Sequence, residues 1–328
     1  MMPLEPRSTP DLEQAIDRHP LVVSPDTLLR DAIALMSQSR GSCSLMDDDS
    51  ALALILSEAR ASCVVVIQEA QLVGIVTERE IVQLTAAGIS LEGVRVTEVM
   101  TQQVTTLKLS QCQDLFAVLT LFRQHQIRHL PIVDEQEQLL GLITPESIRP
   151  FLQPTDLLRL RTLSEVMIAQ VVQAPMTVTV LRLAELMAEH RVSCVVIVEE
   201  RATRPDPSIA ASSDFSPTPL VYPIGMVTER DLVQFHALEL DFLQVQAQNV
   251  MSSPLFCLSP DDSLWNAHQE MLVRRVQRLV VTGDQGELLG IVTQSSLIQT
   301  LDPIELYDTV TFLQQKVYQL EIERIELL

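Results

Sequence analysis

A short motif, Gly-x-x-Thr, occurs four times in this 328-residue chain, at Gly74, Gly141, Gly225 and Gly290. Each copy ends an apolar run of strand-forming residues and precedes a segment with helical periodicity. The glycines are 67, 84 and 65 residues apart. A recurring interval of this size is typical of a chain built from copies of one supersecondary unit.

A second motif recurs at the same intervals. The pair Val-Met occurs at Val99-Met100, Val166-Met167 and Val250-Met251, with intervals of 67 and 84 residues. Each unit reads as an opening strand, an amphipathic helix, a β-branched strand, a turn, the Gly-x-x-Thr strand and a second helix. In the second unit we expect strands at 104–106, 129–133 and 139–143, a helix over 114–125, and a helix beginning at Pro145. The pattern predicts an α/β fold of small sandwich-like repeats.

The repeat spacing also predicts the domain boundaries. A unit of about 65 residues buries a limited fraction of its surface alone, so we expect neighbours to pair. The units are placed at residues 11–90, 91–152, 153–240 and 241–302, followed by a helix at 303–328. Unit one carries an extra segment near 41–60 that echoes the residues after it, and unit three carries a Pro- and Ser-rich insertion at 201–222 that we expect to be mobile.

Charge and composition exclude several classes. With 43 acidic and 23 basic residues the formal net charge is −20, which opposes binding to nucleic acid. No apolar run is long enough for a membrane span, and the first residues do not read as a secretory signal, so we expect a cytoplasmic protein. The five cysteines form no Cys-x-x-Cys pair, and Cys63 and Cys194 occupy equivalent positions where burial is expected.

The four repeats resemble the tandem cystathionine-β-synthase (CBS) domain family, over about residues 11–302. The resemblance implies two pseudo-twofold pairs, called Bateman modules, which commonly bind adenosine-containing ligands in a cleft between paired repeats. It also implies that the Thr hydroxyl and an acidic residue three positions later hold the ribose. Thr228 and Asp231 match this pattern, and Thr77 and Glu80 keep its chemistry with a longer side chain.

The second and fourth repeats depart from the family pattern. Thr144 and Thr293 are followed three positions later by Ser147 and Ser296, which lack the charge-assisted strength of a carboxylate. We therefore expect about one competent cleft per module, with that of the third repeat better formed than that of the first. A structural alternative stays open for all four threonines, because Thr-x-x-Glu at a helix start is also a capping box.

Phosphate groups require cations in this acidic chain. Arg128, beside His129, and Arg278 are the candidates, since a planar guanidinium donates two hydrogen bonds to a phosphate. Arg274 and Arg275 read as a solvated helix face. Neither a phosphate-binding Gly-x-x-x-x-Gly-Lys loop nor a Gly-x-Gly-x-x-Gly turn occurs, so we predict no catalysis and no required cofactor. The family resemblance implies an adenine nucleotide or related adenosyl molecule as effector.

The C-terminal segment carries an apolar heptad seam from Leu306 to Leu327, which predicts a coiled coil. It would connect to an output domain, mediate a homodimer, or fold back on the last repeat pair. Two further functions stay open: a dimerisation scaffold with no ligand, or the sensory half of a histidine kinase or cyclic-dinucleotide synthase. The sequence does not choose among AMP, ADP, ATP, S-adenosylmethionine or a cyclic dinucleotide.

Overall fold

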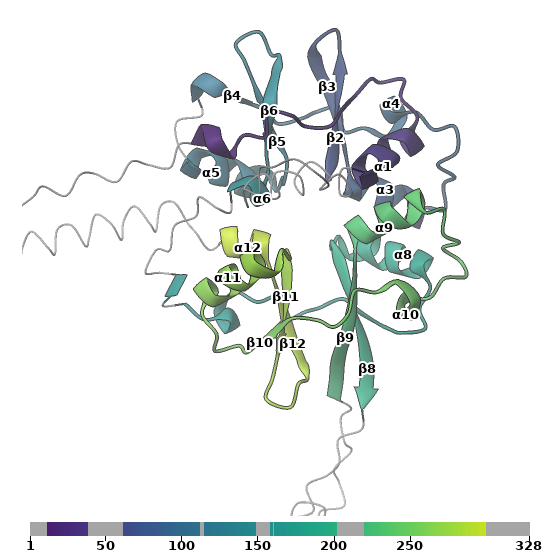
Figure 1. The fold of residues 1–328 in the computed structure, drawn as a ribbon, viewed down its shortest axis with the longest axis vertical. Helices are drawn as coiled ribbons and strands as arrows, with labels where there is room; N and C mark the ends of the chain where they lie inside the picture. Colours follow the sequence, from purple (N-terminus) through teal and green to yellow (C-terminus); the bar gives the residue numbers. More distant parts are fainter. Residues whose placement is uncertain are drawn as a thin grey trace, which may run out of the picture.

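The computed structural model describes residues 12–38, 62–111, 115–148, 158–159, 161–201 and 220–299. The expected insertion near 41–60 and the expected helix at 303–328 lie outside these residues. Within them, each repeat forms its own three-stranded sheet (Figure 1). The first strand of each sheet pairs in parallel with the second, and the second pairs antiparallel with the third.

Repeats one and two form the first module. Its elements are, in chain order, η1 (Leu12–Ala15), β1 (Val22–Val23), α1 (Leu29–Gln38), β2 (Cys63–Gln68), β3 (Gln71–Thr77), α3 (Glu78–Ala86), α4 (Val96–Val99), β4 (Leu107–Lys108), η2 (Leu109–Gln111), α5 (Leu115–His125), β5 (Leu130–Val133), β6 (Leu139–Ile143) and α6 (Pro145–Ile148).

Repeats three and four form the second module. Its elements are η4 (Leu163–Glu165), β7 (Gln173–Pro175), α8 (Val180–His190), β8 (Cys194–Arg201), β9 (Leu220–Thr228), α9 (Glu229–Ala237), α10 (Ala247–Val250), β10 (Cys257–Leu258), α11 (Leu264–Arg274), β11 (Arg278–Thr282), β12 (Leu288–Thr293) and α12 (Gln294–Gln299). The strand-helix-strand-strand-helix order predicted from the repeats is confirmed.

Two expected boundaries are wrong. The opening strand of repeat two is Leu107–Lys108, not 104–106, because Leu107 and Lys108 pair with β5 and Leu107 delivers a buried apolar side chain to the core. The expected insertion at 201–222 is also too wide. Antiparallel pairing continues to Arg201 and resumes at Leu220, and the Arg201 guanidinium lies 4.9 Å from the centre of the Tyr222 ring.

The repeated glycines have a packing role. A Cβ at Gly74 would lie 2.5 Å from Sδ of Met100, and Gly225 and Gly290 would clash in the same way with Met251 and Met167. In three of the four motifs the glycine therefore leaves room for the methionine of a Val-Met pair. At Gly141 the side chain in this position is Ile16. The fourth member of the Val-Met series is thus Ala15-Ile16, which the sequence pattern did not reveal.

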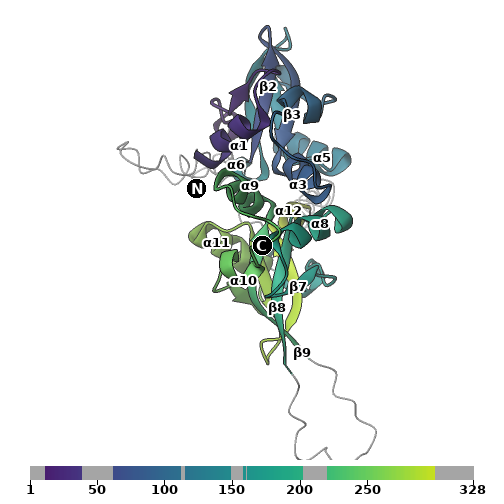
Figure 2. The same cartoon turned by 90° about the vertical axis from the view of Figure 1, so that its right-hand side faces the viewer.

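The two modules meet through their helices. In Figure 2 the first module lies above the second, with α3, α8 and α9 between their sheets. Helix α3 packs against α8 and α9, and α1 packs against α9, so repeat one faces repeat three. Helix α12 packs against α5 and α6, so repeat two faces repeat four. Hydrophobic cores cross the boundary: Val82 of α3 belongs to the core of repeat three.

The sheets of paired repeats meet within each module. Cys194, Val196 and Met226 of repeat three pack against Val280 and Ile291 of repeat four. The equivalent cluster of the first module joins repeats one and two. Cys63 and Cys194 are both buried, as predicted, each opposite the Thr of its own motif. None of the described helices is long and apolar enough to cross a membrane.

Candidate functional site

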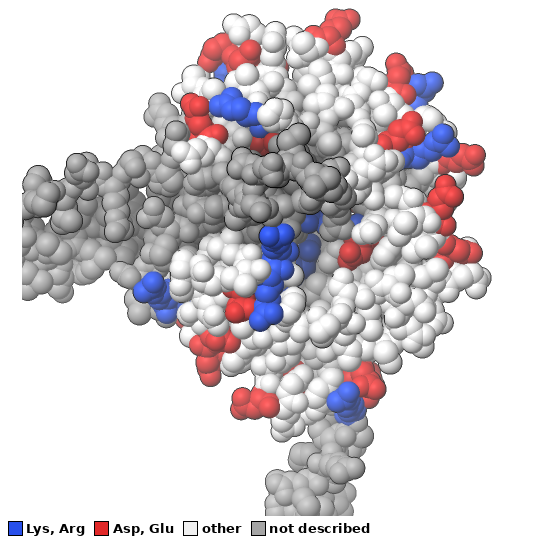
Figure 3. Space-filling model, viewed as in Figure 1, with Lys and Arg blue, Asp and Glu red and all other residues white. Residues whose placement is uncertain are grey.

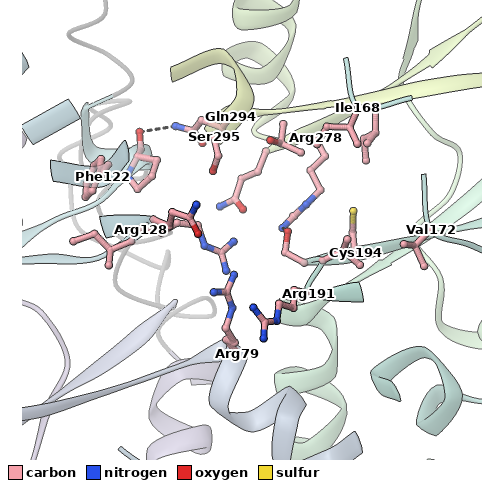
Figure 4. Close-up of a pocket in the computed structure, with 18 of the residues that line it drawn as sticks. Arg79, Phe122, Arg128, Ile168, Val172, Arg191, Cys194, Arg278, Gln294 and Ser295 are labelled. Atoms are coloured by element: carbon pink, nitrogen blue, oxygen red, sulfur yellow. Dashed lines mark hydrogen bonds between the residues drawn. The ribbon is translucent and has the colours of Figure 1, made fainter. Parts of the chain in front are cut away.

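A cavity of about 760 Å³ lies at the centre of the molecule, lined by residues from all four repeats. Basic side chains gather at the middle of the face drawn in Figure 3, between the two modules. Four of the lining arginines come one from each repeat, and Figure 4 shows their side chains converging on the same space. They are Arg79, Arg128, Arg191 and Arg278.

Two of these arginines have no carboxylate partner in the part of the chain that the structure describes. Arg191 occupies the left-handed position that ends α8, with a φ of 54°. Arg278 begins β11, where its Nη2 donates to Ser193 Oγ at 2.8 Å, while its buried Nε has no hydrogen-bond partner. In a chain with a net charge of −20, cations without a carboxylate partner are what an anionic ligand requires.

Two further polar atoms on the repeat-four wall lack partners. Among the described residues, Gln277 Nε2 and Gln294 Oε1 have no hydrogen-bond partner although they are buried, while Gln294 Nε2 donates to the Pro145 carbonyl at 2.5 Å. Buried polar atoms are nearly always satisfied in folded proteins. With Arg278 Nε, two donors and one acceptor on residues of this wall are buried without a partner among the described residues.

The other two arginines face Glu229, the first residue of α9, whose side chain is 3% exposed. Arg128 Nη2 donates to its Oε2 at 2.8 Å, and Arg79 Nε lies 3.9 Å from its Oε1. Burial disfavours the charge on Arg128, but Glu229 outweighs this and raises the Arg128 pKa. Repeats one and two therefore both supply cations to one carboxylate of repeat three.

A second buried pair crosses the same interface. Arg230 Nε donates to Glu78 Oε1 at 3.0 Å, and both side chains are largely buried. Burial raises the pKa of Glu78, and Arg230 offsets part of that rise. Arg230 also acts on Glu146 of repeat two: burial alone would raise the Glu146 pKa, but Arg230 and local hydrogen bonds bring it below its ordinary value.

The two modules repeat one hydrogen bond with different residues. Ser62 Oγ lies 2.8 Å from His129 Nε2 in the first module, and Ser193 with Arg278 takes the same place in the second. Burial, then the neighbouring Arg128, lowers the pKa of His129 to about 3. The side chain at this position is thus the neutral His129 in repeat two and the cationic Arg278 in repeat four.

The predicted ribose residues of the odd repeats form capping boxes. Asp231 Oδ2 accepts from Thr228 N at 2.8 Å and from Thr228 Oγ1 at 2.7 Å. Glu80 Oε2 does the same for Thr77, at 2.8 and 2.5 Å, and its Oε1 accepts from Thr101 at 3.2 Å. Both oxygens of Glu80 are thereby used, whereas Asp231 Oδ1 has no partner among the described residues.

The even repeats cap their helices with serine. Ser147 Oγ accepts from Thr144 N at 3.0 Å, and Ser296 Oγ accepts from Thr293 N at 2.8 Å. Thr144 is 1% exposed and Ser147 is fully buried. Thr293 is partly exposed and lines the central cavity. The capping geometry weighed from the sequence is present in all four repeats.

Of the eight predicted site residues, Arg128, Arg278 and Thr293 line the cavity. Its lining does not include the other five, Thr77, Glu80, Thr144, Thr228 and Asp231. Sequence reasoning missed Arg79, Arg191, Gln277 and Gln294. No pattern within its own repeat marked Arg191 as a ligand residue, since it stands at an ordinary helix-to-strand junction. Arg274 is exposed and stacks on Phe256, with the Arg274 guanidinium 4.3 Å from the ring centre, as expected for a surface residue.

No group of His, Cys, Asp or Glu among the described residues is arranged to hold a metal ion. The cavity arginines come from four separate repeats, so a ligand bound there would contact both modules.

Comparisons with known proteins agree with this architecture. An uncharacterised protein of Methanopyrus kandleri is 30% identical over 139 residues, which are 42% of this chain and 61% of that protein. A crystal structure of MJ1225 from Methanocaldococcus jannaschii, described as a candidate archaeal homologue of γ-AMPK, is similar with a TM-score of 0.65 at 18% identity, covering 88% of this chain and 99% of that one.

A second solved structure, of an uncharacterised conserved protein from Pyrococcus horikoshii, is similar with a TM-score of 0.53 at 12% identity and the same coverage. These two likenesses establish the fold. The CBS domain family matches residues 12–86, 96–153, 163–204 and 247–302. The chain belongs to the CBS domain family, with four repeats paired into two Bateman modules.

Proposed function

We propose that this chain is a regulatory module that binds an adenine nucleotide, with the phosphates of the ligand in the central cavity. The observation that carries the proposal is the pair of arginines, Arg191 and Arg278, that face the cavity without a carboxylate partner in the described part of the chain. Guanidinium groups bind phosphate oxygens through two parallel hydrogen bonds. A cavity of about 760 Å³ lies within the range typical of small-molecule sites.

The charge of the cavity favours particular effectors. AMP, ADP, ATP and cyclic dinucleotides all bring phosphate groups to the arginines. S-adenosylmethionine brings a cationic sulfonium centre and no phosphate, so arginines would gain less from it. We therefore place nucleotides ahead of S-adenosylmethionine.

The ribose contact is proposed at Thr228 and Asp231, in agreement with the family pattern. The cap uses only Asp231 Oδ2, so its Oδ1 is available to accept from a ribose hydroxyl. Glu80 has both oxygens engaged by Thr77 and Thr101, which makes Thr77 and Glu80 a weaker ribose site. Thr293 lines the cavity but pairs with Ser296, and buried Thr144 is proposed to serve as a cap.

Ligand occupancy would act through the contact between the modules. A ligand shifts a conformational equilibrium only by binding one arrangement more tightly than another. Since the cavity arginines belong to both modules, a ligand that draws them together would favour one packing of the modules. We propose that an output partner reads this change through residues 303–328, which we also expect to support a homodimer in the cytoplasm.

The test is isothermal titration calorimetry, with thermal unfolding alongside, using AMP, ADP, ATP and S-adenosylmethionine. A ligand at 100 times its Kd stabilises by about 2.7 kcal/mol, a shift of several degrees in Tm. Arg278→Ala should abolish or strongly weaken binding. Arg274→Ala is the matched control, since it removes one exposed arginine of the same repeat that does not line the cavity. Absence of binding by every nucleotide would favour a ligand-free scaffold.

A further inference from the structure

Helices α3 and α9 begin with nearly the same sequence, and their first residues, Glu78 and Glu229, are both buried where the modules meet. Their cationic partners differ. Glu78 pairs with Arg230, which is not among the residues that line the cavity. Glu229 instead faces Arg128 and Arg79, both of which line it. Glu229 therefore forms its ion pairs with two cavity-lining arginines, whereas Glu78 forms its ion pair with Arg230 and acts on Arg128 without a hydrogen bond.

The strand register explains the difference. In repeat four, Arg278 pairs with the motif threonine, Thr293. In repeat two, Leu130 pairs with Ile143, the residue before the motif threonine Thr144, so Leu130 is equivalent to Leu279. The position equivalent to Arg128 in repeat four is therefore Gln277, one residue before Arg278. Gln277 is neutral, and its Nε2 has no hydrogen-bond partner in the part of the chain that the structure describes. A cation from the even repeat thus reaches Glu229 and none from the equivalent position reaches Glu78.

We propose that Glu229 is an internal competitor of the ligand, a carboxylate that holds Arg128 and Arg79 and must yield Arg128 for a phosphate to bind. The inference rests on the proposed function and names the residue that sets its affinity. Glu229 is a positioning residue, because it acts through the two arginines and not on the ligand directly. Figure 4 shows Arg128 and Arg79 reaching into the same space.

The sign of the effect follows from electrostatics. Glu229 is 3% exposed, so its charge is weakly screened by water and repels a second anion bound to the same guanidinium. A phosphate that recruits Arg128 also reduces the neutralisation of this buried carboxylate, and a buried charge without its partner is strongly unfavourable. The apparent affinity is reduced by the fraction of molecules in which Glu229 retains Arg128.

The same exchange couples the cavity to the module interface. Glu229 belongs to repeat three, Arg128 to repeat two and Arg79 to repeat one, so the three side chains span both modules. When Arg128 moves to a phosphate, the start of α9 loses its 2.8 Å contact with repeat two. Ligand binding would thereby weaken one cross-module ion pair and leave the Glu78–Arg230 pair in place.

The experiment titrates ATP, and separately inorganic pyrophosphate, into the full chain at fixed ionic strength by calorimetry. Glu229→Gln should bind both probes about tenfold more tightly than the wild type. Glu78→Gln is the matched control at the equivalent position, and it should change Kd much less than Glu229→Gln, because its ion-pair partner Arg230 lies outside the cavity lining and it acts on Arg128 without a hydrogen bond. Arg128→Gln should bind more weakly.

Competition predicts opposite changes in affinity, with tighter binding by Glu229→Gln and weaker binding by Arg128→Gln. If the ion pair were purely structural, both variants would bind more weakly. Equal or weaker binding by Glu229→Gln, with ATP bound by the wild type, overturns the inference and leaves the proposed function standing. No binding by the wild type or by Glu229→Gln overturns both. If Glu229→Gln does not fold by circular dichroism, Glu229→Asp, which shortens the side chain by one methylene, should still tighten binding, and unchanged affinity would count against the inference.

Discussion

The starts of α3 and α9 have nearly identical sequences and different surroundings. Thr77-Glu78-Arg79-Glu80 and Thr228-Glu229-Arg230-Asp231 form the same capping box in the same strand register. Yet Arg79 is 47% exposed beside the cavity, whereas the side chain of Arg230 is 13% exposed and pairs with buried Glu78. The two copies share their local structure, and the side chains that other repeats place around them differ.

The largest expected difference between the two copies is in stability. Arg230→Ala leaves Glu78 buried without its ion-pair partner, so we expect a loss of about 3 to 5 kcal/mol in the free energy of unfolding. Arg79→Ala removes an exposed side chain with a long ion pair and should cost less than about 1 kcal/mol. Urea unfolding at pH 7 measures both. Equal losses would mean that the two interface arginines are energetically equivalent, contrary to their burial.

Where the copies share a packing device, their variants should behave alike. Gly74→Ala and Gly225→Ala force a Cβ against Met100 and Met251, respectively, and each should cost about 1 to 3 kcal/mol through overpacking. The double variant Gly225→Ala/Met251→Ala should be more stable than the sum of its single losses predicts, because the second change removes the clash. Strictly additive losses in urea unfolding would contradict the assignment of these methionines as the partners of the glycines.

A smaller difference concerns the ribose residues. Asp231→Asn keeps an acceptor for the cap but removes the charge of the oxygen proposed for the ribose, so ATP should bind about tenfold more weakly. Glu80→Gln is the matched variant, and because both Glu80 oxygens are already engaged, its Kd should change by less than about twofold. Calorimetric titration gives both values, and the reverse order would move the nucleoside site to repeat one.

The smallest effect is expected in the pH dependence near neutrality. Thr85 of α3 and His236 of α9 occupy equivalent positions and meet at 2.7 Å between the modules. Burial lowers the pKa of His236 to about 4, so below pH 6.5 the unfolded chain takes up a proton that the folded chain does not. Stability is then lost as the pH falls, by about 0.7 kcal/mol between pH 7 and 6 for this histidine.

His236→Gln should reduce that loss by the same amount, while His129, which burial also keeps neutral, retains its own contribution in both proteins. Urea unfolding of the wild type and the variant at pH 7 and pH 6 provides the comparison. An identical loss in the two proteins would show that His236 does not titrate in this range upon unfolding.

The fold was largely readable from the chain. Four glycines and three Val-Met pairs in phase predicted the repeats, their strand order and the equivalence of Cys63 and Cys194, because each pattern depends on local periodicity. The misplaced opening strand shows the limit of local reasoning: the β-branched residues at 104–106 have high strand propensity, but Leu107 reaches the core. Ala15-Ile16 was not recognised because it packs as the Val-Met pairs do but has a different sequence.

The site was predicted only in part. Arg128, Arg278 and Thr293 were chosen from their positions in the repeats, and all three line the cavity. Arg79 lies in the motif in which Thr77 and Glu80 were the predicted ligand residues. Arg191 ends a helix in a repeat that has no arginine at the start of its central strand. Neither position marks itself as a ligand residue within its own repeat.

Periodicity and composition alone therefore determine the number of repeats, the order of strands and helices within each repeat, and the acidic net charge of the chain. Tertiary structure decided which repeats face each other, that arginines from all four repeats line one cavity, and that Glu229 forms ion pairs with two of them. The physical reason is that periodic patterns report contacts between near neighbours in sequence, whereas the electrostatics of the cavity depend on side chains brought together across two modules from residues 79 to 278.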